Sequence, residues 1–177
     1  GDVYKRQGFG FVLDLSTDGF LSSAAKDFDG ITSIESFDPA SLSDKPVFEL
    51  TKRLVASCPG CLLSVSLPCP DFLPDTWSKG QRKDQQSLHQ RRQVFRLMLR
   101  RVVTLVDLVT ASGGDVVFQM PTVSSSWLLK EVVGLQHMHN LCTAVFGGES
   151  STVRVVCNTP RMTVHLKHLQ TLARDKG

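Results

Sequence analysis

The 177-residue sequence has no long apolar run. None of its hydrophobic stretches approaches the roughly 20 residues that a membrane-spanning helix needs, and its first residues, GDVYKRQ, lack the apolar core of a signal peptide. We therefore expect an intracellular protein without a membrane partner, with the nucleus as one candidate location. Because residues 1–7 are polar and show no periodicity, we interpret them as a remnant of cloning or sequencing that lies outside the fold.

The sequence also lacks a disulfide framework and a complete set of metal ligands. Its five cysteines are odd in number and irregularly spaced, so we expect reduced thiols. Cys58 and Cys61 have the spacing of a redox or zinc motif, but no second such pair exists, and we favour a turn with incidental thiols. His137, His139 and Cys142 lack a fourth ligand. The sequence predicts no metal site.

Positive charge is concentrated in one segment. Residues 79–101 contain eight lysines and arginines and a single acid, Asp84, which gives this segment a charge of +7 and leaves −4 on the rest. Exposed arginines on a helix are commonly only a solvated face. A basic segment on an otherwise acidic chain is also typical of proteins that bind a polyanion such as nucleic acid.

Hydrophobic periodicity predicts strands that alternate with helices. The expected strands are Phe9–Leu15, Gly30–Ser36, Cys61–Pro68, Asp115–Met120, Cys142–Phe146 and Thr152–Cys157. The expected helices are Phe20–Phe28, Pro46–Ser57, Leu88–Thr110, a segment from Trp127 to His137 capped by the serines Ser124–Ser126, and a last one that begins near Pro160.

This order predicts an α/β fold with one domain over residues 8–177. We expect a Rossmann-like three-layer sandwich: a mostly parallel sheet, helices on both faces, and a terminal antiparallel hairpin formed by the last two strands. Cys61–Pro68 and Asp115–Met120 are mostly apolar runs that we expect to be buried on both faces, so they should be neighbouring central strands. Ligands of such sheets bind beyond the carboxyl ends of the strands, which directs attention to residues 14–19, 35–38, 68–77 and 119–127.

The motifs at these four ends resemble those of the cytosine-5 DNA methyltransferases, Rossmann-like enzymes that use S-adenosylmethionine. DLSTDGF, from Asp14 to Phe20, resembles the cofactor loop of that family. LPC, with Cys69, resembles its Pro-Cys nucleophile motif, and FQMP, with Gln119, stands where the family has a glutamate that holds the target base. VFGGESSTVRVV resembles a late motif, in which Arg154 matches an arginine.

The same motifs resemble, in the same order, a methyltransferase-like domain of retroelement polyproteins. That domain has four features in sequence: SxPCxxW, a basic helix, GGxxxFEWPxxxxxW and an FG…WRIVT run. This sequence has a counterpart for each in the same order: SLPC, the arginine-rich helix, GGDVVFQMP with Trp127, and FG…VRVV. This sequence departs from that pattern at Trp77, which an insertion displaces, and at Gln119, which replaces the acid. No separate target-recognition domain fits in the remaining length.

The resemblance implies a set of site residues. It implies catalytic roles for Cys69, Gln119 and Arg154, and a site for S-adenosylmethionine formed by Asp14, Gly19, Phe20, Glu35 and Pro68, with Glu35 after the second strand on the ribose. Nucleic acid would contact the segment that follows the nucleophile motif, namely Trp77, Lys79, Arg82, Lys83, Arg91 and Arg92. If Cys69 acts, its pKa should be lowered, and a cofactor pocket should open between residues 14–19, Glu35 and residues 67–68.

Alternatives remain for these assignments. Cys69 is either a nucleophile or a buried structural cysteine, and the general tendency of cysteine to be buried favours the second. Trp77 either stacks on a base or fills the core. Gln119 cannot supply the proton of a carboxylic acid, and the cofactor loop keeps only Gly19. The leading interpretation is a DNA cytosine-5 methyltransferase-like domain with degenerate motifs, and the alternative is a non-catalytic nucleic-acid-binding domain of a retroelement polyprotein.

Overall fold

Six strands form one mixed sheet in the order β2-β1-β3-β4-β6-β5. The computed structural model describes residues 10–16, 33–67, 69, 72, 85–138, 142–147 and 152–158. The strands are β1 (Phe11–Leu15), β2 (Ser33–Phe37), β3 (Leu62–Ser66), β4 (Asp115–Pro121), β5 (Cys142–Gly147) and β6 (Thr152–Cys157). The first four are mutually parallel, and β6 runs antiparallel to both β4 and β5.

Two predictions about this sheet are confirmed. β3 and β4 are neighbouring central parallel strands, with Leu63 opposite Val116 and Val65 opposite Phe118. β5 and β6 form the antiparallel hairpin at the end of the described chain. The chain therefore has the expected Rossmann-like α/β fold, with a mostly parallel arrangement and a terminal hairpin.

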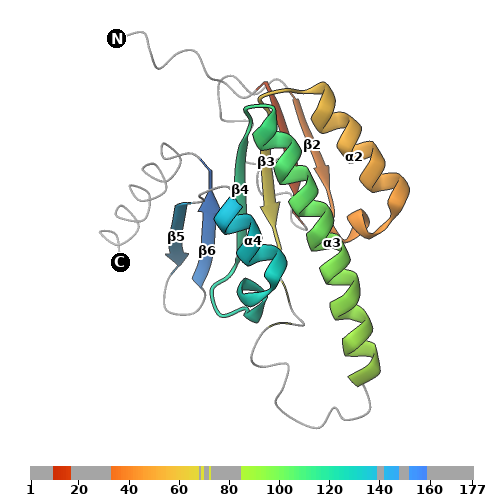
Figure 1. Cartoon of the computed structure of the whole chain (residues 1–177), viewed down its shortest axis with the longest axis vertical. Helices are drawn as coiled ribbons and strands as arrows, with labels where there is room; N and C mark the ends of the chain where they lie inside the picture. Colours follow the sequence, from red (N-terminus) through yellow and green to blue (C-terminus); the bar gives the residue numbers. More distant parts are fainter. Residues whose placement is uncertain are drawn as a thin grey trace.

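Three α-helices lie together on one face of the sheet (Figure 1). They are α2 (Lys45–Ser57), α3 (Gln85–Ala111) and α4 (Lys130–Met138), and the 3-10 helices η3 (Pro39–Ser43) and η7 (Ser125–Leu128) precede α2 and α4. The helices expected at Phe20–Phe28 and after Pro160 lie outside the described residues. Within the described part, no helix combines the length and the apolar character that crossing a membrane requires.

The core lies between the sheet and these helices. Successive side chains of a strand point to opposite faces, and Leu63, Val65, Val116 and Phe118 belong to the same buried cluster as the inner face of α3. Both faces of β1 are shielded, because the consecutive residues 12–15 are all buried. Such burial on both faces explains why β1 and β3 have apolar residues at consecutive positions, such as residues 12–13 and 62–63.

The helix α3 has two unlike halves. Its second half contributes Leu99, Val102, Val106 and Val109 to the core, all with no exposed surface. Its first half extends past the carboxyl ends of the parallel strands (Figure 1), and no residue from Ser87 to Leu97 is buried. At 1.5 Å per residue the 27-residue helix is about 40 Å long, much longer than the five-residue strand β3 on which it packs.

Two sequence predictions are wrong in detail. The helix expected from Trp127 to His137 is divided, because the Ser124 hydroxyl accepts a hydrogen bond from the Ser126 amide and starts a 3-10 turn, after which Leu129 is extended. Glu35, expected after the second strand, lies within β2, because that strand runs to Phe37. The acid that follows the strand is Asp38, whose carboxylate accepts a hydrogen bond from the Ala40 amide and caps η3.

Candidate functional site

The candidate nucleophile Cys69 lies in a tight turn directly beyond β3. The Phe72 amide donates a hydrogen bond to the Cys69 carbonyl at 3.0 Å, and Cys69 has a φ of +52°, a left-handed conformation that is uncommon for a residue with a side chain. The turn is fastened to the loop after β4, since the Ser125 hydroxyl donates to the Phe72 carbonyl at 3.1 Å. Cys69 thus stands at the carboxyl end of the sheet, as the resemblance implies.

The thiol of Cys69 nevertheless points into the protein. Cys69 is only 1% exposed, and its sulfur donates a hydrogen bond to the Leu67 carbonyl at 3.3 Å. Burial raises the pKa of this thiol to about 11, although hydrogen bonding to Ser126 and Ser124 acts in the opposite direction. The expectation that a working Cys69 has a lowered pKa is therefore not met.

Gln119 and Arg154 lie on opposite faces of the sheet. Gln119 is opposite Ser66 of β3 and Val155 of β6, so its side chain points away from the helices. Arg154 is opposite Met120, on the helix-covered face, where its guanidinium lies 5.0 Å from the ring centroid of Trp127. The three residues that the resemblance implies as catalytic are therefore not brought together, because Gln119 diverges from Arg154.

Trp127 is a structural residue. It is 5% exposed, its indole N–H donates to the Pro121 carbonyl at 2.9 Å, and its ring packs edge-on against Phe118 at 5.9 Å. The cation–π contact with Arg154 then ties β6 to the loop after β4. These contacts account for Arg154 as part of the scaffold.

The described cofactor residues do not form one site. Asp14, on β1, is 1% exposed and accepts a hydrogen bond from the Ser16 hydroxyl at 3.0 Å. Glu35 is paired with Leu13, so it lies on the opposite face of the sheet from Asp14, and it is exposed. Asp14 and Glu35 therefore do not face one common pocket, and part of the pocket expected between residues 14–19, Glu35 and residues 67–68 lies outside the described residues. Three further cofactor residues, Gly19, Phe20 and Pro68, lie outside the described residues, as do four of the nucleic-acid residues, Trp77, Lys79, Arg82 and Lys83.

Two arginines of α3 serve the fold. Arg100 forms an ion pair at 3.2 Å with Glu131, whose side chain is 7% exposed and which lies in the first turn of α4. Desolvation opposes the charge of Glu131, but a backbone hydrogen bond and Arg100 outweigh it and lower the pKa of this carboxyl. Arg101 donates to the Leu42 carbonyl and lies over the Phe48 ring at 5.1 Å. These contacts link α3 to α4, η3 and α2.

Three other arginines lie on the exposed half of α3. Arg91 and Arg96 are exposed, and Arg92 is half-buried with its guanidinium 5.2 Å from the Phe72 ring centroid. Phe72 in turn packs against Phe95, with the two ring centroids 4.8 Å apart. The turn that carries Cys69 is therefore joined directly to the basic part of the helix.

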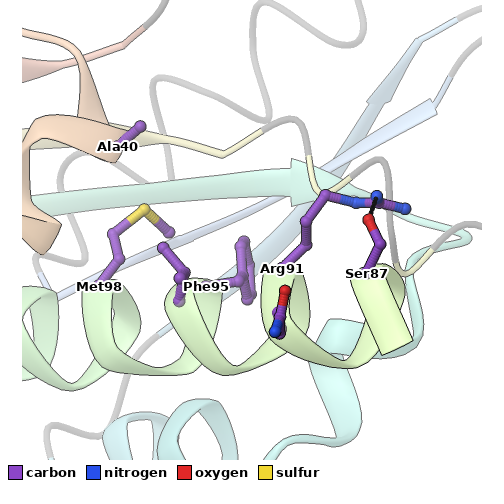
Figure 2. A pocket seen from close by; sticks show the side chains of 7 residues that line it. Ala40, Ser87, Arg91, Phe95 and Met98 are labelled. Atoms are coloured by element: carbon purple, nitrogen blue, oxygen red, sulfur yellow. Dashed lines mark hydrogen bonds between the residues drawn. The ribbon is translucent and has the colours of Figure 1, made fainter. Parts of the chain in front are cut away.

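A shallow cavity of about 360 Å³, largely open to solvent, lies beside this half of α3. Its apolar lining comes from Val94, Phe95 and Met98 of the helix, with Ala40 of η3 on the opposite side (Figure 2). Ser87 and Arg91 lie at one end, where the guanidinium donates a hydrogen bond to the hydroxyl. The sequence pattern does not predict this cavity; its one signal is the position of Phe95 among arginines, one turn before the fully buried Leu99.

The described residues contain no group of three or more His, Cys, Asp or Glu residues that could hold a metal ion. The CPGC segment forms a turn, as predicted: the Cys61 amide donates to the Cys58 carbonyl at 3.2 Å, and Gly60 has a φ of +76°.

Comparisons with models of protein families, with curated proteins and with solved structures find no match for this chain.

Proposed function

We propose that this chain is a methyltransferase-like domain that binds nucleic acid through the exposed half of α3 and does not transfer methyl groups. One observation carries the proposal: a helix of 27 residues keeps its arginine-rich first half outside the core, beyond the carboxyl ends of the strands. Here the side chains of Val94 and Leu97 are 50% and 39% exposed among the arginines.

The charge of this half suits a phosphate backbone. Arg91, Arg92 and Arg96 lie within two turns, and Asp107 is the first acid after them on the helix. Guanidinium groups bind phosphate oxygens with two parallel hydrogen bonds, and each neutralised phosphate releases condensed counterions. The partner that this pattern supports is nucleic acid, with DNA as the partner that the resemblance implies.

The surroundings of Cys69 weigh against catalysis. A thiol with a pKa of about 11 is ionised in about one molecule in ten thousand at pH 7, and only the thiolate attacks a pyrimidine ring. The Gln119 side chain points to the face of the sheet that lies away from the helices, and it carries no acidic proton. It therefore cannot act as a general acid in that attack. The divergence of Asp14 and Glu35 likewise gives no support to a role for S-adenosylmethionine.

A mechanism-based trap separates binding from catalysis. The protein is incubated with S-adenosylmethionine and DNA that carries 5-fluorocytosine, and the mixture is analysed on native and on denaturing gels. We expect a complex on the native gel that weakens as salt is raised, and no covalent complex on the denaturing gel. A covalent complex that disappears in Cys69→Ser would show that the thiol still attacks cytosine and would overturn the proposal.

A further inference from the structure

The cavity beside α3 combines an apolar interior with a cationic end. Ala40, Val94 and Met98 supply aliphatic and thioether surface, Phe95 supplies an aromatic ring, and Arg91 and Ser87 lie at one end (Figure 2). Its volume of about 360 Å³ lies near the lower end of the range of small-molecule pockets, about 300 to 1,000 Å³, and its open side leaves room for a ligand that continues into solvent. A ligand that matches both parts has a flat, weakly polar ring and an attached negative charge.

The aromatic wall of the cavity is held in place from behind. Phe95 packs at an interplanar angle of 43° against Phe72, which does not line the cavity. Arg92 covers Phe72 in turn, and the Phe72 carbonyl accepts a hydrogen bond from Ser125. Because these contacts fix the ring before any ligand arrives, stacking on Phe95 would not require the side chain to be ordered on binding.

We propose that this cavity receives an unpaired base of single-stranded nucleic acid, with the adjoining phosphate at Arg91. The inference rests on the proposed nucleic-acid binding and specifies its form. Stacking of a base on an aromatic side chain requires a base that is not already stacked and paired, so a single strand fits and a duplex does not. Arg96, exposed on the same half of the helix and close enough to Glu131 to lower the pKa of that carboxyl, would contact the neighbouring phosphates.

The test compares probes that have the same charge and differ in their bases. Binding of the full chain is measured by fluorescence anisotropy with a single-stranded thymidine oligomer of about 12 nucleotides, with an abasic oligomer of equal length, and with the matching duplex. We expect the thymidine strand to bind on the order of tenfold more tightly than the abasic strand and more tightly than the duplex.

Two substitutions remove the cavity or its aromatic face without changing the charge. Ala40→Leu places a larger side chain in the cavity from an exposed position of η3, and Phe95→Leu keeps the apolar bulk but not the ring. Both should bind the thymidine and abasic strands equally, with the same salt dependence as the wild type. Leu97→Ala, on the same half of the helix but outside the cavity lining, is the matched control and should keep the preference for bases.

The outcomes separate this inference from the function on which it rests. Equal, salt-dependent binding of thymidine and abasic strands by the wild type, or tighter binding of the duplex, overturns the base pocket and leaves phosphate binding intact. Absence of salt-dependent binding to every probe overturns both. If the variants do not fold, the fluorescence of a single strand that carries 2-aminopurine is measured with the wild-type protein. Binding should quench this fluorescence if the base stacks in the cavity, and unchanged fluorescence overturns the base pocket.

Discussion

Cys69 shows how one residue can keep the position of a nucleophile without its chemistry. A left-handed φ at a residue with a side chain costs on the order of 1 kcal/mol and persists only where the surroundings impose it. Here the Phe72 amide, the Leu67 carbonyl and the loop after β4 together hold the turn. The same contacts direct the sulfur toward Ser124 and Ser126, so the thiol is enclosed where a working site would expose it.

Thiol reactivity should follow this enclosure. At pH 8 the native protein should react with iodoacetamide at Cys58, which is partly exposed, before Cys61 and Cys69, which are buried. Burial raises the pKa of both Cys61 and Cys69, and the neighbouring Cys58 raises that of Cys61 further. Peptide mass spectrometry after a time course measures the order, and early modification of Cys69 would contradict the geometry described above.

The raised pKa of Cys69 also predicts a dependence of stability on pH. The folded protein holds the proton more tightly than the unfolded chain, whose thiol has an ordinary pKa near 9, whereas the folded value is about 11. The stabilisation is therefore fully present below about pH 9 and is lost as the pH rises toward 11, by about 2–3 kcal/mol in total. Urea unfolding at pH 8 and pH 10.5 should show a larger loss for wild type than for Cys69→Ala, and equal losses would refute the assignment.

The junction between α3 and β4 sets the position of both elements. Gly113 ends the helix with a φ of +76°, and the Gly114 amide donates to the Val109 carbonyl at 2.8 Å. A Cβ atom at Gly114 would lie 2.5 Å from the Cys61 carbonyl oxygen and 2.7 Å from a methyl group of Val109. The absence of a side chain at this residue therefore lets β4 enter the sheet directly beneath the helix that precedes it.

Two glycine substitutions test this account of the elements. Gly114→Ala should lower the free energy of unfolding by about 2–4 kcal/mol, because the contact with the Cys61 carbonyl involves backbone that cannot move aside. Gly134→Ala, within α4 and with no atom near the added methyl group, should instead raise it by about 0.5–1 kcal/mol through helix propensity. Denaturant unfolding measures both, and similar effects of the two substitutions would show that the junction is looser than described.

At the scale of the whole molecule, local patterns predict the sheet well. β3 and β4 are mostly apolar runs bounded by turns; β3 is buried on both faces and β4 at alternate residues, which fits their place at the centre of the sheet. The short connection between residues 147 and 152 favours the hairpin of β5 and β6. These features depend on neighbouring residues in the sequence, which is why the sequence alone predicts them.

The candidate site depends on contacts between distant residues, which local patterns do not contain. The pKa of Cys69 is set mainly by burial in the folded core and is modified by two serines more than fifty positions later in the chain. Whether Glu35 or Asp38 follows β2 depends on where that strand ends, a boundary that periodicity places only to within a few residues. The exposed half of α3 contains apolar residues, Val94, Phe95 and Leu97, as the buried half does. The sequence therefore does not distinguish the two halves, and only the structure shows that the first half projects from the core.

The salt dependence of nucleic-acid binding tests the central claim most directly. Kd for a single-stranded thymidine oligomer is measured across a salt series for three proteins. These are the wild type, a triple variant of α3 (Arg91→Gln, Arg92→Gln, Arg96→Gln), and a control triple variant that removes three exposed charges elsewhere (Lys45→Gln, Arg53→Gln, Lys130→Gln). Loss of three phosphate contacts should reduce the slope of log Kd against log salt by about 2 and weaken binding by about tenfold or more, while the control stays close to wild type. Equal slopes for the two triple variants, or a wild-type affinity that does not change with salt, would contradict the account.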